Sequence, residues 1–145
     1  MCLVTYDKRK IAKEDITVYK MLCKHTNLKT NKTEYLPPYW NGYTYKKGKN
    51  KTVGENEEIK SMNFVYYYVG GGFLHAFTNL NYALYTCRQQ FRDATYCDGD
   101  EDFKDEYRVY EMTIPKGTEY YIGTDEDICA KTLVWKNMTP CEEPV

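Results

Sequence analysis

Apolar and polar side chains alternate along several short segments of this chain. Residues 16–23 and 107–114 have this pattern, and residues 61–69 and 128–135, which are rich in apolar and aromatic side chains, are also predicted as strands. Alternation with a period of two is typical of strands that bury one face. Shorter extended segments are predicted at residues 43–46, 73–77 and 119–122. The pattern therefore predicts a domain built mainly of strands.

One segment follows the period of a helix instead. Apolar residues recur there at intervals of three or four positions: Leu80, Ala83, Leu84, Cys87 and Phe91. Such spacing places them on one face of an amphipathic helix. Thr78 stands just before the first of them, and threonine is a favoured residue at a helix N-cap. We expect one main helix at about residues 79–91.

Turn-forming and charged residues separate these segments. Residues 24–42 are polar and include Pro37-Pro38, so they are expected to form one long loop. The basic residues 46–51 and the acidic residues 98–102 are interpreted as solvated loops. Pro115-Lys116-Gly117 is interpreted as a turn that joins residues 107–114 and 119–122 into a hairpin.

These elements predict an α+β fold. We expect mostly antiparallel strands in a split or partly closed barrel-like pair of sheets, with the one main helix. The length of 145 residues is close to the commonest size of a single domain, so residues 1–145 are expected to form one. The Pro-containing acidic residues 136–145 are expected to be a loose C-terminal tail.

The overall charge limits the partners. A formal net charge of -1 gives no general attraction to nucleic acid or to an anionic membrane, so neither is expected to bind. The sequence contains no apolar run of about 20 residues and no secretory hydrophobic region after Met1, which predicts a cytoplasmic protein. Frequent Lys, Asn and Tyr are typical of an AT-rich genome and fit a protein of a phage or mobile element. For such a protein the expected location is the cytoplasm of the host.

The six cysteines are widely spaced and include no Cys-x-x-Cys pair, so reduced thiols and no zinc site are expected. The acidic residues 98–102 resemble half of a calcium loop, but Phe103 and Val109 stand where an EF-hand has glycine and glutamate. No metal ligands are therefore predicted.

The segment from Gly70 to Leu80 combines a strand, a helix start and a histidine. Its three glycines lack the Gly-Lys-Ser/Thr that would make a phosphate-binding loop, so a turn between strands is predicted. His75 is the candidate acid or base of this segment, because its ordinary pKa is near 6.5. A hydrogen-bonded structural histidine is the favoured alternative. His25 lies in a polar stretch and is expected to be solvated.

The order of several short motifs resembles mono-ADP-ribosyltransferases. They are Val18-Tyr19-Lys20, residues 72–79, a helix containing Ala83, and residues 109–118 with Ile114-Pro115-Lys116-Gly117-Thr118. The segment around His75 also resembles a Gly-Phe-His-Ala-Phe segment of small uncharacterised phage and gut-bacterial proteins. The resemblance implies an ADP-ribosyltransferase-like fold and a cleft for a nucleotide-like, NAD-like ligand. The residues it places in that cleft are Tyr19, Lys20, Tyr43, His75, Thr78 and Tyr85.

The same resemblance bears on catalysis. Transferases of this class carry a late catalytic glutamate on a strand and a Ser-Thr-Ser-like segment before the helix. Here Glu126 is predicted to lie in a turn, and residues 75–78 read His-Ala-Phe-Thr. We therefore predict a non-catalytic binding or interaction protein, with no required cofactor, that binds a nucleotide-like small molecule or a host protein. The alternative is an active transferase, or another small nucleotide-processing enzyme, that uses His75 and Glu126.

Overall fold

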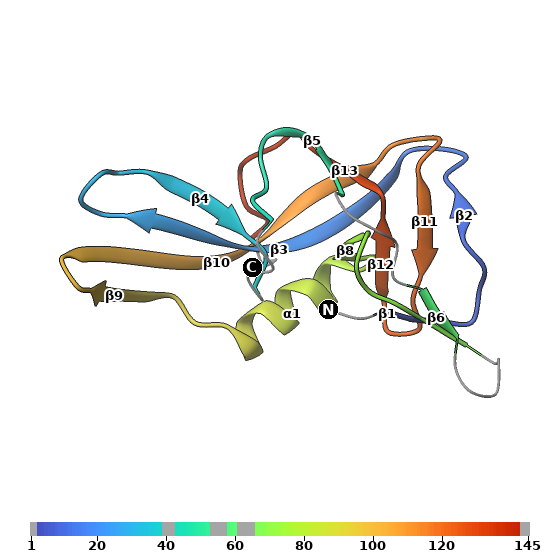
Figure 1. Ribbon diagram of the computed structural model, residues 1–145, viewed down its shortest axis with the longest axis horizontal. Helices are drawn as coiled ribbons and strands as arrows, with labels where there is room; N and C mark the ends of the chain where they lie inside the picture. Colours follow the sequence, from blue (N-terminus) through green and yellow to red (C-terminus); the bar gives the residue numbers. More distant parts are fainter. Residues whose placement is uncertain (1–2, 39–42, 53–57, 61–65, 143–145) are drawn as a thin grey trace.

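Two antiparallel sheets and one helix make up the computed structural model, which describes residues 3–38, 43–52, 58–60 and 66–142 (Figure 1). The smaller sheet has the order β1-β7-β6, and the larger has ten strands with the path β2-β11-β12-β8-β3-β10-β13-β5. Two further strands of the larger sheet lie off this path, with β4 on β3 and β9 on β10. The larger sheet is not closed into a barrel, because among the described residues its end strands β2 and β5 do not pair with each other. The predicted α+β class is confirmed.

The strands and the helix of the described residues have the following bounds: β1 Leu3–Thr5, β2 Lys10–Ile11, β3 Ile16–Asn27, β4 Thr33–Leu36, β5 Gly48–Lys51, β6 Glu58–Lys60, β7 Tyr67–Val69, β8 Leu74–Phe77, α1 Leu80–Gln90, β9 Ala94–Asp98, β10 Glu101–Ile114, β11 Glu119–Ile122, β12 Asp127–Ala130 and β13 Thr132–Trp135.

The two longest strands, β3 and β10, form the centre of the larger sheet. They pair without interruption from Ile16 opposite Ile114 to Asn27 opposite Phe103. Alternate residues of β3 point to opposite faces, so Val18 and Leu22 enter one core while Met21 enters another. This continuous pairing fixes which residues of β3 meet each core.

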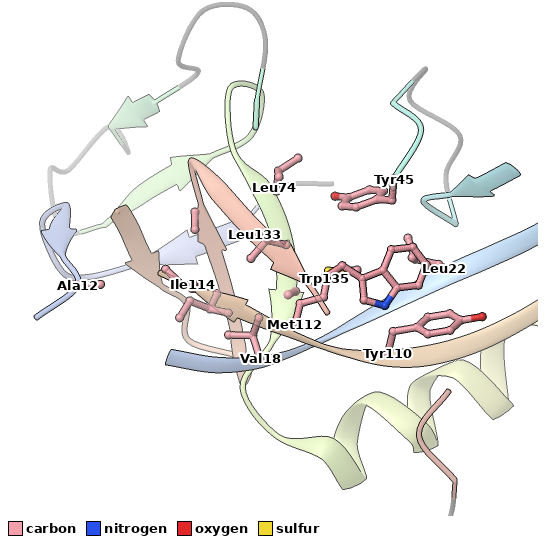
Figure 2. Close-up of a cluster of buried hydrophobic side chains, with 13 residues drawn as sticks. Ala12, Val18, Leu22, Tyr45, Leu74, Tyr110, Met112, Ile114, Leu133 and Trp135 are labelled. Carbon is pink, nitrogen blue, oxygen red and sulfur yellow. The ribbon is translucent and has the colours of Figure 1, made fainter. Parts of the chain in front are cut away.

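The main core is built around an aromatic cluster on one face of these strands (Figure 2). The Trp135 ring is 4.9 Å from both the Tyr35 and the Tyr110 ring, in edge-to-face contacts. Trp135 is fully buried, and its indole N–H donates to the carbonyl of Asn137 over 3.0 Å. On the other face α1 packs its buried residues Ala83 and Cys87 against the sheet.

The distal halves of β3 and β10 continue into an arm on the left of Figure 1, where β4 and β9 extend them on either side. The predicted loops at residues 24–42 and 98–102 are therefore wrong in these parts. Polar residues form strands here because both faces of the arm are largely half-exposed and its backbone groups pair in the ladder. Gly99, with φ of 66°, allows the tight turn between β9 and β10.

The predicted hairpin of residues 107–114 and 119–122 is also wrong. Both segments are strands, but β11 pairs with β2 and β12, while β10 pairs with β3, β9 and β13. The turn between them is bound to Ala12: Gly117 donates to the Ala12 carbonyl over 2.8 Å, and Ala12 donates to Thr118 over 2.9 Å. These bonds direct β11 toward β2 and away from β10.

The predicted strand at residues 128–135 is two strands. Lys131 separates β12 from β13 and donates its backbone N–H to Glu119 over 3.1 Å. The first strand pairs with β8 and β11, and the second with β10 and β5. The apolar residues 128–135 therefore form two strands that occupy different positions in the sheet.

A strand is predicted at residues 43–46, but the structure has it a few residues later, as β5. Tyr45 forms an isolated bridge with Tyr35, and the strand is β5, in the segment predicted as a basic loop. Asn50 is fully buried, and its side chain accepts from Lys46 N over 2.9 Å and donates to Lys46 O over 2.8 Å. This satisfied amide replaces the apolar residue that would have marked a strand.

Two further predictions, for residues 61–69 and for the C-terminal tail, can be compared with the structure only in part. Of the strand predicted at residues 61–69, β7 is observed and residues 61–65 lie outside the described residues. Within the C-terminal tail, Cys141 donates its backbone N–H to Val109 over 2.7 Å. This part of the tail therefore lies against β10.

Candidate functional site

The site begins where β3 and β8 meet. Their register consists of one pair, Tyr19 opposite Phe77. If the ladder continued, Met21 would lie opposite His75, but the Lys20 ammonium instead donates to the His75 carbonyl over 2.6 Å. A side chain of β3 thus occupies the place where a backbone hydrogen bond between the two strands would be expected.

Lys20 is buried between apolar neighbours. It is 7% exposed, and the same-face residues Val18 and Leu22 are fully buried. Its Nζ lies 5.3 Å from the centre of the Tyr45 ring, in cation–π geometry. Burial lowers the pKa of Lys20 to about 8 because a desolvated ammonium is unfavourable. Among the described residues no carboxylate lies within ion-pair distance of it.

His75 is held neutral beside Lys20. It is 9% exposed, and its Nε2 lies 3.0 Å from the Gly70 carbonyl, which can only accept, so Nε2 carries the proton. Burial, with a smaller contribution from the Lys20 charge, lowers the pKa of His75 to about 4. The turn of glycines thus fixes the tautomer of the imidazole and leaves Nδ1 as an acceptor.

A cavity of about 160 Å³ opens beside these two residues. The described residues that line it come from β3, β8, α1 and two loops: Lys20, Met21, Pro38, His75, Ala76, Phe77, Tyr82, Thr86, Gln90 and Asp125. Tyr82, Thr86 and Gln90 lie four residues apart and form one polar row on α1. The Tyr82 hydroxyl donates to Asp125 over 3.1 Å. The residues that line the cavity thus include a lysine with a buried ammonium, from the sheet, and an aspartate with an exposed carboxylate, near the helix start.

Two of the six predicted ligand residues, Lys20 and His75, line this cavity. Tyr19 packs in the cluster beneath α1, beside the lining residues Met21 and Phe77. The Tyr43 ring packs edge-to-face against the Tyr45 ring, with centroids 4.8 Å apart. Tyr85 is 56% exposed on α1. Tyr19, Tyr43 and Tyr85 are outside the described lining of the cavity.

Thr78 and Glu126 have a structural relationship instead. The backbone N–H and the hydroxyl of Thr78 both donate to the Glu126 carbonyl, over 2.9 and 3.0 Å. Glu126 has φ of 52° in the turn before β12, and its side chain is exposed. The predicted N-cap is wrong by one residue, because Asn79 caps α1 by accepting from Tyr82 N over 3.0 Å.

Sequence reasoning missed four polar lining residues: Tyr82, Thr86, Gln90 and Asp125. The spacing of the three helical residues was a usable signal, because it forms a polar row next to the apolar row of α1. Asp125 had no such signal. It reaches the cavity only because the turn before β12 is bonded to Thr78.

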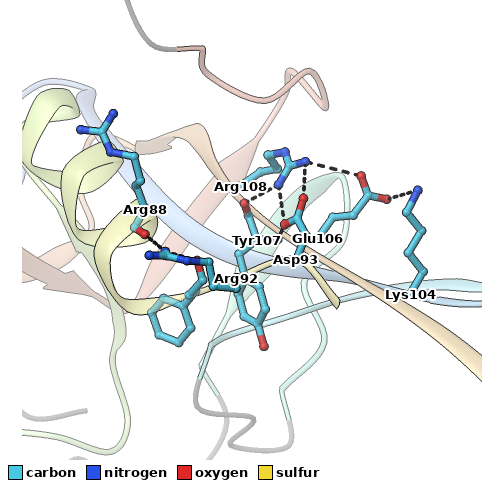
Figure 3. A network of polar contacts seen from close by, with 8 residues as sticks. Arg88, Arg92, Asp93, Lys104, Glu106, Tyr107 and Arg108 are labelled. Atoms are coloured by element: carbon cyan, nitrogen blue, oxygen red, sulfur yellow. Dashed lines mark hydrogen bonds and ion pairs between the residues drawn. The ribbon is translucent and has the colours of Figure 1, made fainter. Parts of the chain in front are cut away.

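A larger hollow of about 580 Å³ lies at the other end of α1, beside β10. Arg108 donates there to both carboxylate oxygens of Asp93 over 2.8 Å, and its guanidinium also lies 3.7 Å from Glu106 (Figure 3). The Arg92 guanidinium donates to the carbonyl of Arg88 at the end of the helix. The positive charge of Arg108 is therefore paired with carboxylates of the protein, whereas that of Lys20 has no carboxylate partner among the described residues.

The arm contains a second polar pair. The Nδ1 of His25 lies 2.5 Å from Asp105 Oδ1, and the side chains are 14% and 9% exposed. The His25 ring stacks on Phe103 with centroids 4.7 Å apart. The prediction that His25 is solvated is therefore wrong, because pairing of β3 with β10 places Asp105 directly opposite it.

Within the described residues, no group of three His, Cys, Asp or Glu side chains is arranged to hold a metal ion. Cys23, Cys87 and Cys129 are buried free thiols, as expected from their apolar surroundings. In the part of the chain that the structure describes, no helix is long and apolar enough to cross a membrane.

Comparisons with protein-family models, with curated proteins and with solved structures found no match to this chain. The resemblance to mono-ADP-ribosyltransferases therefore stays a prediction, carried by its short motifs.

Proposed function

We propose that this chain is a binding protein whose cavity between β3, β8 and α1 holds a small ring-shaped ligand through an anionic or carbonyl oxygen. The observation that carries this proposal is that Lys20, whose ammonium is buried and contacts the carbonyl of another lining residue, His75, lines the cavity. A buried charge is normally paired, because its transfer from water is costly. A ligand oxygen would supply the charged or polar partner that the described carboxylates do not.

The size of the cavity limits the ligand. About 160 Å³ is close to the roughly 150 Å³ of a protein cavity that accommodates benzene. A single ring with one polar substituent is therefore the appropriate size, and a complete dinucleotide would have to extend into solvent. Nicotinate and nicotinamide are suitable probes, since each combines one ring with a carboxylate or carboxamide. Because nicotinamide is the ring of NAD, an NAD-like ligand remains part of the proposal.

The remaining lining supports binding of a ring that carries a polar group. Phe77 and Tyr82 provide aromatic surface, with ring centroids 5.5 Å apart. Thr86 and Gln90 add hydrogen-bonding groups along the helix. Asp125 disfavours a second negative charge at the helix start, because like charges repel. We therefore expect a monoanion or a neutral amide to bind better than a dianion.

Catalysis by His75 and Glu126 has weaker support. A general base works best when its pKa is close to the working pH, and burial lowers the pKa of His75 to about 4. The exposed Glu126 side chain is outside the described lining of the cavity. Non-catalytic binding is thus the function that the geometry supports best.

Ligand titration followed by two-dimensional amide NMR tests the proposal. Nicotinate, nicotinamide and benzoate are added to the wild type and to Lys20→Met, with Lys24→Met as a matched control on the same strand. We expect shifts centred on β8 and the first half of α1, at least a 10-fold weaker affinity for benzoate in Lys20→Met, and little change in Lys24→Met. Shifts confined to other surfaces, or equal affinities in all three proteins, would refute the proposal.

A further inference from the structure

We propose that Lys20 is also a site of covalent attachment, where its side-chain amine forms an imine with a small aldehyde that enters the cavity. This inference rests on the proposed function, because the aldehyde must occupy the same cavity before it reacts. It goes further by assigning a reaction and a class of carbonyl ligand to one named nitrogen atom.

The surroundings of Nζ suit a protonated imine. Such an imine has one N–H, and the His75 carbonyl, 2.6 Å from Nζ, is placed to accept it. The face of the Tyr45 ring, 5.3 Å from Nζ, stabilises the positive charge. Neither contact needs the two other N–H groups that lysine loses on reaction. The two described contacts of the ammonium can thus be kept in the product.

Burial also makes the amine reactive. With a pKa of about 8, roughly a tenth of Lys20 is neutral at pH 7, against about four in ten thousand for a lysine with an ordinary pKa. The neutral amine is the nucleophile in imine formation. The absence of a nearby carboxylate, among the described residues, removes the interaction that would most strongly keep the nitrogen protonated.

The reaction balances without any oxidant or reductant. The lone pair of Nζ forms a bond to the aldehyde carbon, while the carbonyl electrons move to oxygen, which takes a proton. Nitrogen then loses a proton to water, and the hydroxyl group takes up a proton and leaves as water as the C=N bond forms. The net change is amine plus aldehyde plus one proton to protonated imine plus water. The cavity of about 160 Å³ leaves little room for water beside a ring, which disfavours the reverse hydrolysis.

Reductive trapping with benzaldehyde tests this assignment. The full chain is incubated at pH 7 with benzaldehyde and cyanoborohydride, whose hydride adds to the imine carbon and leaves a stable benzyl amine. Peptide mass spectrometry then gives the extent of benzylation at each lysine and at the α-amino group. Lys20→Met, Lys24→Met and excess benzoate as a competitor are run in parallel, and amide NMR checks that each variant is folded.

We expect Lys20 to be benzylated at least 10-fold faster than the average exposed lysine, and benzoate to slow this reaction while leaving the others unchanged. Lys24→Met should retain fast labelling at Lys20. Labelling of Lys20 at or below the rate of exposed lysines would overturn the inference. If benzoate still binds the cavity in that case, the proposed function stands and only the covalent step is lost; if benzoate does not bind either, both fail.

Discussion

The Nζ of Lys20 lies 2.6 Å from the carbonyl oxygen of His75, at the point where the pairing of β3 with β8 stops. This contact ties a buried charge to the backbone of the neighbouring strand. It also aligns two groups whose charges are both disfavoured by burial, since the pKa of each is lowered. The contact on which the proposed ligand binding rests therefore carries a cost in stability.

Replacement of Lys20 by methionine is expected to stabilise the protein at pH 7 by about 1–3 kcal/mol, because it removes a desolvated charge and keeps an apolar chain of similar length. The native pKa of about 8 lies below the ordinary value of 10.5, so the wild type gains stability as pH rises through this window. The advantage of the variant should shrink over the same range. Urea unfolding at pH 7, 8.5 and 10 measures it; a variant less stable than the wild type at pH 7 would contradict the expected burial cost.

His75 should make the wild type sensitive to acid. Its native pKa of about 4 lies below the ordinary 6.5, so the unfolded chain binds the proton first and stability is lost as pH falls from 6.5 toward 4. The loss amounts to about 3 kcal/mol by pH 4. His75→Gln keeps an N–H donor and lacks this titration, so its unfolding free energy should fall less over the same interval. Parallel curves for the two proteins would exclude the predicted burial of a neutral imidazole.

The pair of His25 and Asp105 should stabilise the arm. Asp105→Asn and His25→Gln are each expected to cost about 1–3 kcal/mol, because each leaves a largely buried partner with a poorer hydrogen bond. A double-mutant cycle by urea unfolding should give a coupling of at least about 0.5 kcal/mol. The exposed pair of Lys32 and Glu34, 4.0 Å apart, is the control and should give less. Equal coupling in both pairs would mean that burial adds nothing.

The capping residue of α1 gives a direct test of where the helix starts. Asn79→Ala removes the acceptor for Tyr82 N and should cost about 1 kcal/mol. Asn79→Asp keeps an acceptor and should cost much less. Thr78→Val, at the position expected from sequence, loses only the hydroxyl bond to Glu126 and keeps the backbone one. Thermal unfolding of the three variants ranks them; a larger loss in Thr78→Val than in Asn79→Ala would reverse the assignment.

The central strand and the helix follow from local pattern. Alternation around Lys20 predicts the strand, although the structure buries both of its faces, and the spacing of Ala83 and Cys87 predicts the face of α1 that meets the sheet. These inferences depend on neighbours within a few residues, which is the range over which pattern is informative. Lys20 and His75 are expected in one cleft because of the resemblance of short motifs to mono-ADP-ribosyltransferases, and the structure places both beside the same cavity.

The remaining features depend on contacts distant in sequence. Asp125 reaches the cavity through the hydrogen bonds of Thr78 to Glu126, 48 residues away, and Asp105 meets His25 across 80 residues. The pairing of β11 follows from bonds between the turn at Gly117 and Ala12. No local propensity encodes such partners, because each is selected by the register of the whole sheet. Polar strands such as β4 were missed for the same reason.

Gly123 controls the turn that brings Asp125 to the cavity, and its replacement by alanine should affect both stability and binding. An added Cβ would collide with Asp127 Oδ1 and lie 2.8 Å from Leu3 Cγ. Because Asp127 Oδ1 also accepts from Asp125 N over 3.3 Å, displacement of that carboxylate should move the turn. We expect a loss of about 1–3 kcal/mol in unfolding free energy, together with a weaker affinity for benzoate. Gly117→Ala is the control: with φ of 89° and no atom within 4 Å of the added Cβ, it should destabilise through backbone strain alone and leave binding unchanged. A second change, Asp127→Ala, should restore part of the stability lost in Gly123→Ala, because it removes the colliding oxygen. If Gly123→Ala were as stable as the wild type and bound benzoate equally well, the turn could not be positioning Asp125 through this contact.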